Sequence, residues 1–237
     1  MYDRQSSADM TAVRSLEVRR LGRMPYQEAL ELQKRLVEQR RAGTIGDLLL
    51  LVEHPSVLTL GVRGDGGRAH ILASEGELVS RHIDVFETGR GGDITYHGPG
   101  QIVGYPIIDL DPDRRDVHKY VRDLEEVLIR VAGDYGIEAG RVQGLTGAWV
   151  GDEKLAAIGV RIQRWVTSHG FALNHTTDLS HFNLIVPCGI ADRGVTSLAA
   201  LGCTASRAEV ETRIAAHFAT VFDRTVVDSL SAVGTDA

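Results

Sequence analysis

Apolar side chains recur every three to four positions in three parts of the chain, and this spacing predicts three long helices. The start and end signals agree with it, because Pro25 and Gly43 bound the first helix and Asp116 is suited to cap the second. Ser206 and Glu209 have the spacing of a capping box at the start of the third. The predicted helices cover residues 25–43, 116–136 and 206–222, with a short one at 69–73.

Short apolar or alternating runs between the helices predict β-strands. The run 47–53 (DLLLLVE) is apolar almost throughout, which is typical of a central strand buried on both faces, whereas 16–21 and 225–227 are expected at sheet edges. The other strands are predicted over 57–60, 83–87, 101–109, 147–150, 154–163 and 166–174, the last three as an antiparallel meander. This order predicts an α+β (mixed α/β) fold whose sheet is largely antiparallel in its second half.

The composition limits the possible functions. A chain of 237 residues that is 43% hydrophobic can bury a sizeable core, and we expect one domain over 14–228 with disordered tails at 1–13 and 229–237. The net charge of -6 argues against nucleic acid as a partner. The two cysteines, Cys188 and Cys203, lack metal-ligand spacing, so we expect no metal site and a cytoplasmic location. No run reaches the ~18 apolar residues of a membrane helix.

One lysine and one cysteine lie in settings that suit chemistry. Of 26 basic residues only Lys34, Lys119 and Lys154 are lysines, and only a lysine can lose its proton when it is desolvated. Lys154 opens an apolar strand and is therefore a candidate base, while Cys188, between a proline and a glycine, is a candidate nucleophile. The residues alone leave a plainer interpretation open, in which Lys154 snorkels from a strand end and Cys188 is a small core residue like Cys203.

The stretch 83–110 carries a second signal. Five glycines surround Arg90, Tyr96 and His97 between two predicted strands, which lets the backbone approach a ligand closely or, equally, form a tight hairpin. In the strand 154–163, side-chain alternation places Lys154 with Ala156, Ile158, Val160 and Ile162, and it places Ala157 and Gly159 on the other face, where small residues leave room for an apolar ligand.

Several motifs in order resemble the lipoyl(octanoyl) transferase family: RGGDITYHGPGQIVGYPIIDL, GAWV, EKLAAIGVRI, HGFALN, IVPCGI and VTSL. The resemblance implies a biotin/lipoate protein ligase-like fold, a curved mixed sheet flanked by helices. It implies transfer of an octanoyl group from octanoyl-acyl carrier protein to a specific lysine of lipoyl domains, the first step of endogenous lipoate synthesis. The implied acceptors are the lipoyl domains of 2-oxoacid dehydrogenase E2 subunits and the glycine-cleavage H protein, and no cofactor is implied.

The same resemblance assigns residues to roles. It implies that Cys188 is the acyl-thioester nucleophile and that Lys154 lowers the pKa of its thiol. It implies three substrate-binding segments: Arg90, Gly91, Gly92, Asp93, Ile94, Thr95, Tyr96 and His97; Ala157, Ile158 and Gly159; Gly170, Phe171 and Ala172. His175 and Thr176 follow no fixed family pattern. Arginines are candidates for docking acidic partners: Arg63, Arg68, Arg81, Arg90, Arg161 and Arg164.

Other activities fit parts of this pattern. An ATP-dependent lipoate or biotin ligase would share the fold, although the chain has no Walker A sequence. An amidotransferase could move octanoyl between lipoyl domains through the same cysteine. A hydrolase could pair the cysteine with His97 or His169, and a non-catalytic module could bind the carrier protein alone.

Overall fold

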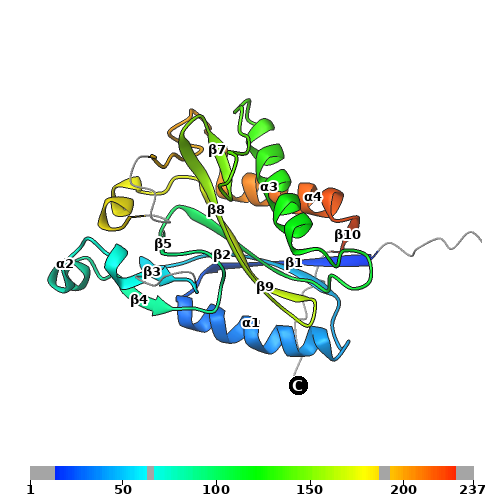
Figure 1. Cartoon of the computed structure of the whole chain (residues 1–237). Helices are drawn as coiled ribbons and strands as arrows, with labels where there is room; N and C mark the ends of the chain where they lie inside the picture. Colours follow the sequence, from blue (N-terminus) through cyan, green and yellow to red (C-terminus); the bar gives the residue numbers. More distant parts are fainter. Residues whose placement is uncertain (1–13, 63–66, 187–192, 228–237) are drawn as a thin grey trace, which may run out of the picture.

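A seven-stranded mixed sheet forms the centre of the molecule (Figure 1). The computed structural model describes residues 14–62, 67–186 and 193–227. The strand order is β10, β1, β2, β6, β9, β8, β7. The bounds are β1 Arg14–Arg23, β2 Asp47–Glu53, β6 Gln101–Ile107, β7 Ala148–Val150, β8 Glu153–Gln163, β9 Val166–Asn174 and β10 Arg224–Val227. The predicted mixed α+β class is confirmed.

The first half of the sheet is parallel and the second half is antiparallel. β1 pairs in parallel with both β2 and β10, so β1 lies inside the sheet and only β10 lies at that edge. The prediction of an edge strand at 16–21 was therefore wrong, because no local pattern showed that the end of the chain adds one further strand. The predicted meander is confirmed, since β7 pairs with β8 and β8 with β9, both antiparallel.

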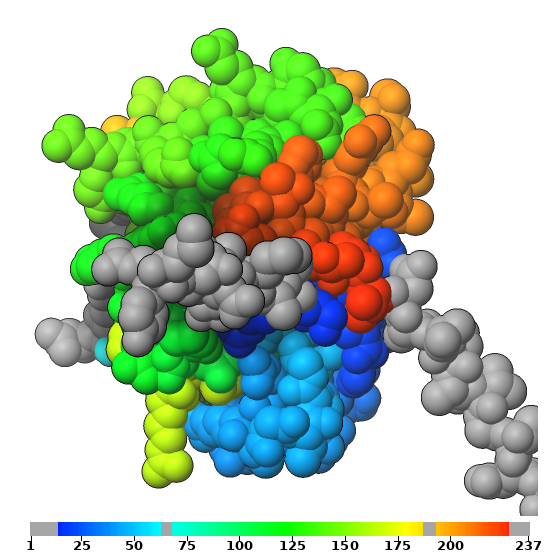
Figure 2. Space-filling model, turned by 90° about the vertical axis from the view of Figure 1, so that its right-hand side faces the viewer, coloured from blue at the N-terminus to red at the C-terminus, as the bar shows by residue number. Residues whose placement is uncertain are grey.

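Helices cover both faces of this sheet. α1 (Tyr26–Arg41) packs on one face, and α3 (Val117–Gly133) and α4 (Arg207–Val221) pack on the other (Figures 1 and 2). The apolar run of β2 serves both layers, because Leu49 and Leu51 join the α3 and α4 core while their neighbours join the α1 core. The expected caps are present as well: Asp116 accepts from the backbone N–H of Lys119, and Ser206 forms the capping box with Glu209.

A second, three-stranded sheet lies beside the large one. Its order is β4, β3, β5, formed by Asp84–Glu87, Val57–Leu60 and Thr95–His97. The strand β5 was not predicted, because it is only three residues long and follows a glycine-rich stretch. The short helix expected at 69–73 was also misplaced: a 3₁₀ helix covers Gly67–His70, and α2 covers Glu75–Ser80 after a capping box between Ser74 and Glu77.

Within the described part of the chain, no helix is both long enough and apolar enough to span a membrane.

A buried carboxylate ties the parallel half of the sheet together. Asp47, 1% exposed in its side chain, accepts from Arg224 Nε at 2.9 Å and from Arg40 Nε at 2.8 Å. It also accepts from the backbone N–H of Asp109 at 3.1 Å. Arg224 is itself only 1% exposed in its side chain. Asp47 thereby joins β2, the edge strand β10 and the end of α1.

Replacing Asp47 with alanine should lower the free energy of unfolding by about 3–5 kcal/mol, because Arg224 would remain buried without its buried carboxylate partner and would keep only the partly exposed Asp113. Urea unfolding at pH 7 measures this. The matched control is Glu17→Ala, which removes the partly exposed pair with Arg19 and should change stability by less than about 1 kcal/mol. Equal effects of the two substitutions would contradict this account of Asp47.

Candidate functional site

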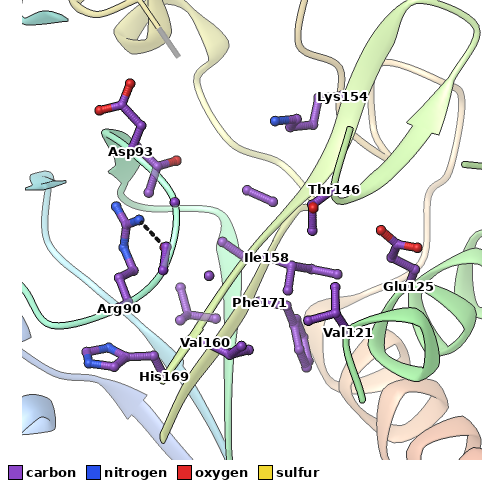
Figure 3. A pocket seen from close by; sticks show the side chains of 18 of the residues that line it. Arg90, Asp93, Val121, Glu125, Thr146, Lys154, Ile158, Val160, His169 and Phe171 are labelled. Carbon is purple, nitrogen blue, oxygen red and sulfur yellow. Dashed lines mark hydrogen bonds between the residues drawn. The ribbon is translucent and has the colours of Figure 1, made fainter. Parts of the chain in front are cut away.

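A cavity of about 860 Å³ lies around β8 and β9, between the glycine-rich loop, α3 and the small sheet. Figure 3 shows Arg90, Asp93 and His169 on one side of the two strands and Val121 and Glu125 on the other. The cavity is lined by Lys154 and by every predicted substrate-binding residue except Tyr96: Arg90, Gly91, Gly92, Asp93, Ile94, Thr95, His97, Ala157, Ile158, Gly159, Gly170, Phe171 and Ala172.

Two of the predicted segments are direct cross-strand partners. In the pairing of β8 with β9, Ala157, Ile158 and Gly159 stand opposite Ala172, Phe171 and Gly170. Tyr96 instead points away from the cavity, where its ring stacks on His181 at 4.9 Å and its hydroxyl lies 3.1 Å from Ser56 Oγ. Tyr96 therefore supports the wall of the cavity from behind.

The glycine-rich loop is anchored on both sides. Arg90 is 7% exposed and donates to the carbonyl and hydroxyl oxygens of Thr59 at 2.6 and 2.9 Å. The backbone N–H of Gly91 donates to the carbonyl of Val160 at 2.8 Å. A Cβ added to Gly159 would lie 2.8 Å from the carbonyl oxygen of Gly91. Gly159 is small because this loop lies directly against it.

This packing bears on two expectations. Ala157 and Gly159 both line the cavity, as expected for small residues beside a ligand site, but at Gly159 the loop takes up part of the space. Arg90, expected among the docking arginines, is buried and bonded to Thr59, so it cannot present its guanidinium to a partner protein. Its role in this structure is to hold the loop against β3 and β8.

A register shift sets the direction of Lys154. Ala156 of β8 pairs with Ala148 of β7, but Lys154 pairs with the next residue, Trp149, so Leu155 is an extra residue in β8. Residues directly opposite each other share a face, and neighbours alternate. Lys154 and Ala156 therefore face opposite sides, and the predicted grouping of the two was wrong. Only the bulge places Lys154 on the side of Ala157 and the glycine-rich loop.

The backbone of Lys154 also pairs with a distant segment. Its N–H donates to the carbonyl of Gly194 and its carbonyl accepts from the N–H of Thr196, both at 3.0 Å. Earlier in the chain, the N–H of Val186 donates at 2.8 Å to the carbonyl of His70, a residue that lines the cavity. The predicted nucleophile, Cys188, lies outside the described residues, between these two anchored segments.

A chain of buried hydrogen bonds links the loop to the strand beside Lys154. Gln101 Nε2 donates to Asn174 Oδ1 at 3.0 Å and to the carbonyl of Tyr96 at 3.2 Å, so its Oε1 must be the acceptor for His97 Nδ1 at 2.8 Å. His97 Nε2 is then an acceptor, and the hydroxyl of Thr59 lies 3.3 Å from it. At the other end, Asn174 Nδ2 donates to the carbonyl of Thr196 at 2.9 Å.

Three histidines near the cavity are held in their neutral form. Burial lowers the pKa of His97 to about 3, and it lowers the pKa values of His54 and His169 to about 4. His54 bonds to the carbonyl of Met24 and to the hydroxyl of Tyr105, both at 2.8 Å. Both ring nitrogens of His97 are engaged in the network above, which disfavours His97 as the base of a cysteine hydrolase.

Sequence reasoning missed several residues of this site. His70 Nδ1 lies 2.6 Å from Asp93 Oδ2, and both residues line the cavity. Val121, from a helix that the sequence marks only as scaffold, and Leu145, from the turn before β7, line its α3 side. Their pattern carries no functional signal, because an apolar residue that faces a cavity cannot be told from one that faces a core. Among the described residues, no group of three or more His, Cys, Asp or Glu side chains could hold a metal ion.

Comparisons with known proteins agree with this geometry. Residues 25–219 match the family model of the lipoyl protein ligase A/B catalytic domain. A similar fold occurs in a putative lipoate protein ligase from Thermoplasma acidophilum with bound lipoic acid (TM-score 0.71, 12% identity, 90% of this chain and 88% of that one). It also occurs in a bipartite lipoate protein ligase solved with its E2 lipoyl domain from the same organism (TM-score 0.70, 16% identity, coverage 90% and 85%).

The fold and the matched domain thus define an enzyme with the lipoyl protein ligase A/B catalytic domain. Over 211 residues, the chain is 56% identical to an octanoyltransferase of Solibacter usitatus, covering 89% of this chain and 94% of that protein. The chain belongs to the lipoyl(octanoyl) transferase family and is a transferase of octanoyl groups in protein lipoylation.

The neutral histidines predict acid sensitivity. In the unfolded chain they protonate near their usual pKa of 6.5, but in the native protein only at about 3 to 4. The unfolded state therefore binds more protons between about pH 6.5 and pH 4, and stability should fall across this window as the pH is lowered. At ~1.4 kcal/mol per pKa unit, the three rings together should cost several kcal/mol between pH 7 and pH 5.

Urea unfolding at pH 7 and pH 5 measures this loss. His118→Gln, which removes an exposed histidine, should leave the pH dependence unchanged, whereas His54→Gln should reduce it. Equal stability of the unmodified protein at the two pH values would refute the assignment of neutral buried rings.

Proposed function

We propose that the enzyme moves octanoyl from octanoyl-acyl carrier protein to a lysine of lipoyl domains, through a thioester on Cys188 with Lys154 as acid and base. The observation that carries the proposal is the position of Lys154, which lines the cavity while its backbone pairs with residues 194–196. The octanoyltransferase relatives support the octanoyl group. The neighbour solved with an E2 lipoyl domain supports lipoyl domains as acceptors.

Chain connectivity supports the pairing of Cys188 with Lys154. Cys188 follows Val186 by two residues, and two residues of chain span at most about 7 Å. Val186 is bonded to His70, which lines the same cavity as Lys154. Gly194, which follows Cys188 by six residues, is bonded to the backbone of Lys154. Both ends of the segment that carries the cysteine are therefore held at this cavity.

The chemistry needs one group that can give and take a proton. An ammonium about 4 Å from a thiol stabilises its thiolate by up to ~4 kcal/mol at an effective dielectric of 20, which lowers the thiol pKa. The thiolate of Cys188 attacks the donor thioester, and Lys154 gives its proton to the departing pantetheine sulfur. Neutral Lys154 then takes a proton from the incoming lysine amine, which attacks the acyl carbon. That proton finally passes to the sulfur of Cys188.

The substrates fit the cavity chemically. The apolar side chains of Val103, Ala157 and Ala172 line the cavity from the face of the sheet that Lys154 shares, and they supply a lining for an acyl chain. One methylene changes binding in such a pocket by only about 1–3 kcal/mol, so acyl groups slightly shorter or longer than octanoyl should also react. Exchange of one thioester for another is nearly isoenergetic and amide formation from a thioester is downhill, so the proposed reaction uses no ATP.

Incubation with octanoyl-acyl carrier protein should add one octanoyl group to the enzyme, visible by intact-mass spectrometry. The adduct should be absent in Cys188→Ala and should disappear when apo lipoyl domain is added. Cys203→Ala is the matched control, since it removes the only other cysteine of the chain, and it should keep the adduct. Release of pyrophosphate with free octanoate and ATP would indicate a ligase instead, and octanoyl-H protein acting as the better donor would indicate an amidotransferase.

Lys154→Arg should lower kcat for octanoyl transfer by about 10²-fold or more, because arginine keeps the positive charge but cannot cycle a proton. The matched control is Lys119→Arg, which changes an exposed lysine paired with Asp123 and should leave kcat unchanged. Steady-state transfer to a lipoyl domain measures both variants. A Lys154→Arg enzyme as fast as the unmodified one would remove the acid and base role from this residue.

A further inference from the structure

The side chain of Trp149 lies directly behind Lys154. The Nζ atom of Lys154 is 4.7 Å from the centroid of the Trp149 ring, and the Cζ atom of Arg193 is 5.7 Å from the same centroid. Trp149 is 3% exposed. Lys154 lines the cavity and Trp149 does not. The indole thus forms a buried aromatic surface against which the ammonium rests.

The backbone around Trp149 holds this surface in place. The N–H of Trp149 donates to the carbonyl of Gly140 at 2.9 Å, and the N–H of Gly140 donates back to the carbonyl of Trp149 at 2.7 Å. On its other side β7 pairs with β8, and the one-residue shift at Leu155 sets Trp149 opposite Lys154. Without that shift, Lys154 would stand opposite Val150, a residue with no π face.

We infer that Trp149 is a positioning residue for octanoyl transfer, which holds the ammonium of Lys154 toward the cavity through a cation–π contact. This inference rests on the function proposed above for Lys154. A lysine side chain has four rotatable bonds and loses much freedom when it is held in one place. The quadrupole of the indole attracts the ammonium but offers no acceptor for its proton, so this contact does not oppose the proton transfers proposed for the amine.

A carboxylate in the place of Trp149 would act differently. It would hold the lysine in its charged form and oppose the step in which the neutral amine accepts a proton. Arg193 shares the same ring, and its guanidinium pairs with Asp152 Oδ1 at 2.6 Å, so the second cation on the ring has its own counter-ion. The carboxylate of Asp152 thus pairs with Arg193, and the indole of Trp149 contacts both cations.

The chain allows a direct test because it contains only three lysines and two tryptophans. Reductive methylation with ¹³C-formaldehyde labels the lysine amines, and Lys34→Arg and Lys119→Arg assign their signals. The methyl signal of Lys154 should be displaced upfield by the ring current of the indole. The displacement should disappear in Trp149→Leu and persist in part in Trp149→Phe. This readout requires no activity, so its outcome is independent of the proposed function.

Kinetics complete the test on the unlabelled enzymes. Trp149→Leu should lower kcat for octanoyl transfer about tenfold with little change in KM, and Trp149→Phe should restore it to within about threefold of the unmodified enzyme. Trp165→Leu is the matched control, since Trp165 also carries a cation, Arg115 at 5.7 Å, but this cation does not line the cavity. It should leave kcat unchanged.

The outcomes separate the two claims. Two results would overturn the role of Trp149 and leave the proposed function standing. One is a methyl signal of Lys154 that is not displaced upfield. The other is a Trp149→Leu enzyme as fast as the unmodified one while the Lys154→Arg enzyme is slow. A fast Lys154→Arg enzyme would overturn the proposed function itself. If Trp149→Leu does not fold, the Trp149→Phe enzyme tests the role of Trp149 instead. Loss of transfer activity in this variant, while the methyl signal of Lys154 stays displaced upfield, would contradict a positioning role.

Discussion

The site depends on the backbone pairing of β8, which is shared among several distant segments. β8 pairs with β9 along most of its length, with β7 at its start and with residues 194–196 at Lys154. The glycine-rich loop adds a further bond from Gly91 to Val160. Each of these bonds uses backbone groups alone, so the side chains between them are left to line the cavity (Figure 3). One strand thereby fixes the relative positions of segments that are up to about a hundred residues apart in sequence.

The hydrogen-bond network around His97 allows several polar side chains to be buried beside the cavity. Its members satisfy one another from Thr59 to Thr196, and the direction of each bond follows from the amide of Gln101. A satisfied network of this kind is rigid, whereas a protonated His97 would add a buried positive charge near Arg90. Burial keeps the ring neutral, so the same physical cause protects the arrangement and makes the protein sensitive to acid.

The histidines and the lysine of the site differ in their surroundings. His54 and His97 form hydrogen bonds through both ring nitrogens and stabilise the structure around the cavity. Lys154 lies at the cavity wall against an aromatic face. An aromatic contact attracts an ammonium without offering an acceptor for its proton, which suits the acid and base role proposed for Lys154.

Local pattern in the sequence determined the three long helices, their caps, the central strand β2 and the meander of β7, β8 and β9, since these depend on periodicity and on residues within one turn. The motifs also indicated the segments that line the cavity and the family. Only the tertiary structure decided that β1 is internal, that Gly159 is small to admit a loop, and that Lys154 faces that loop. Register, bulges and close backbone approach are properties of two segments together, so neither segment shows them alone.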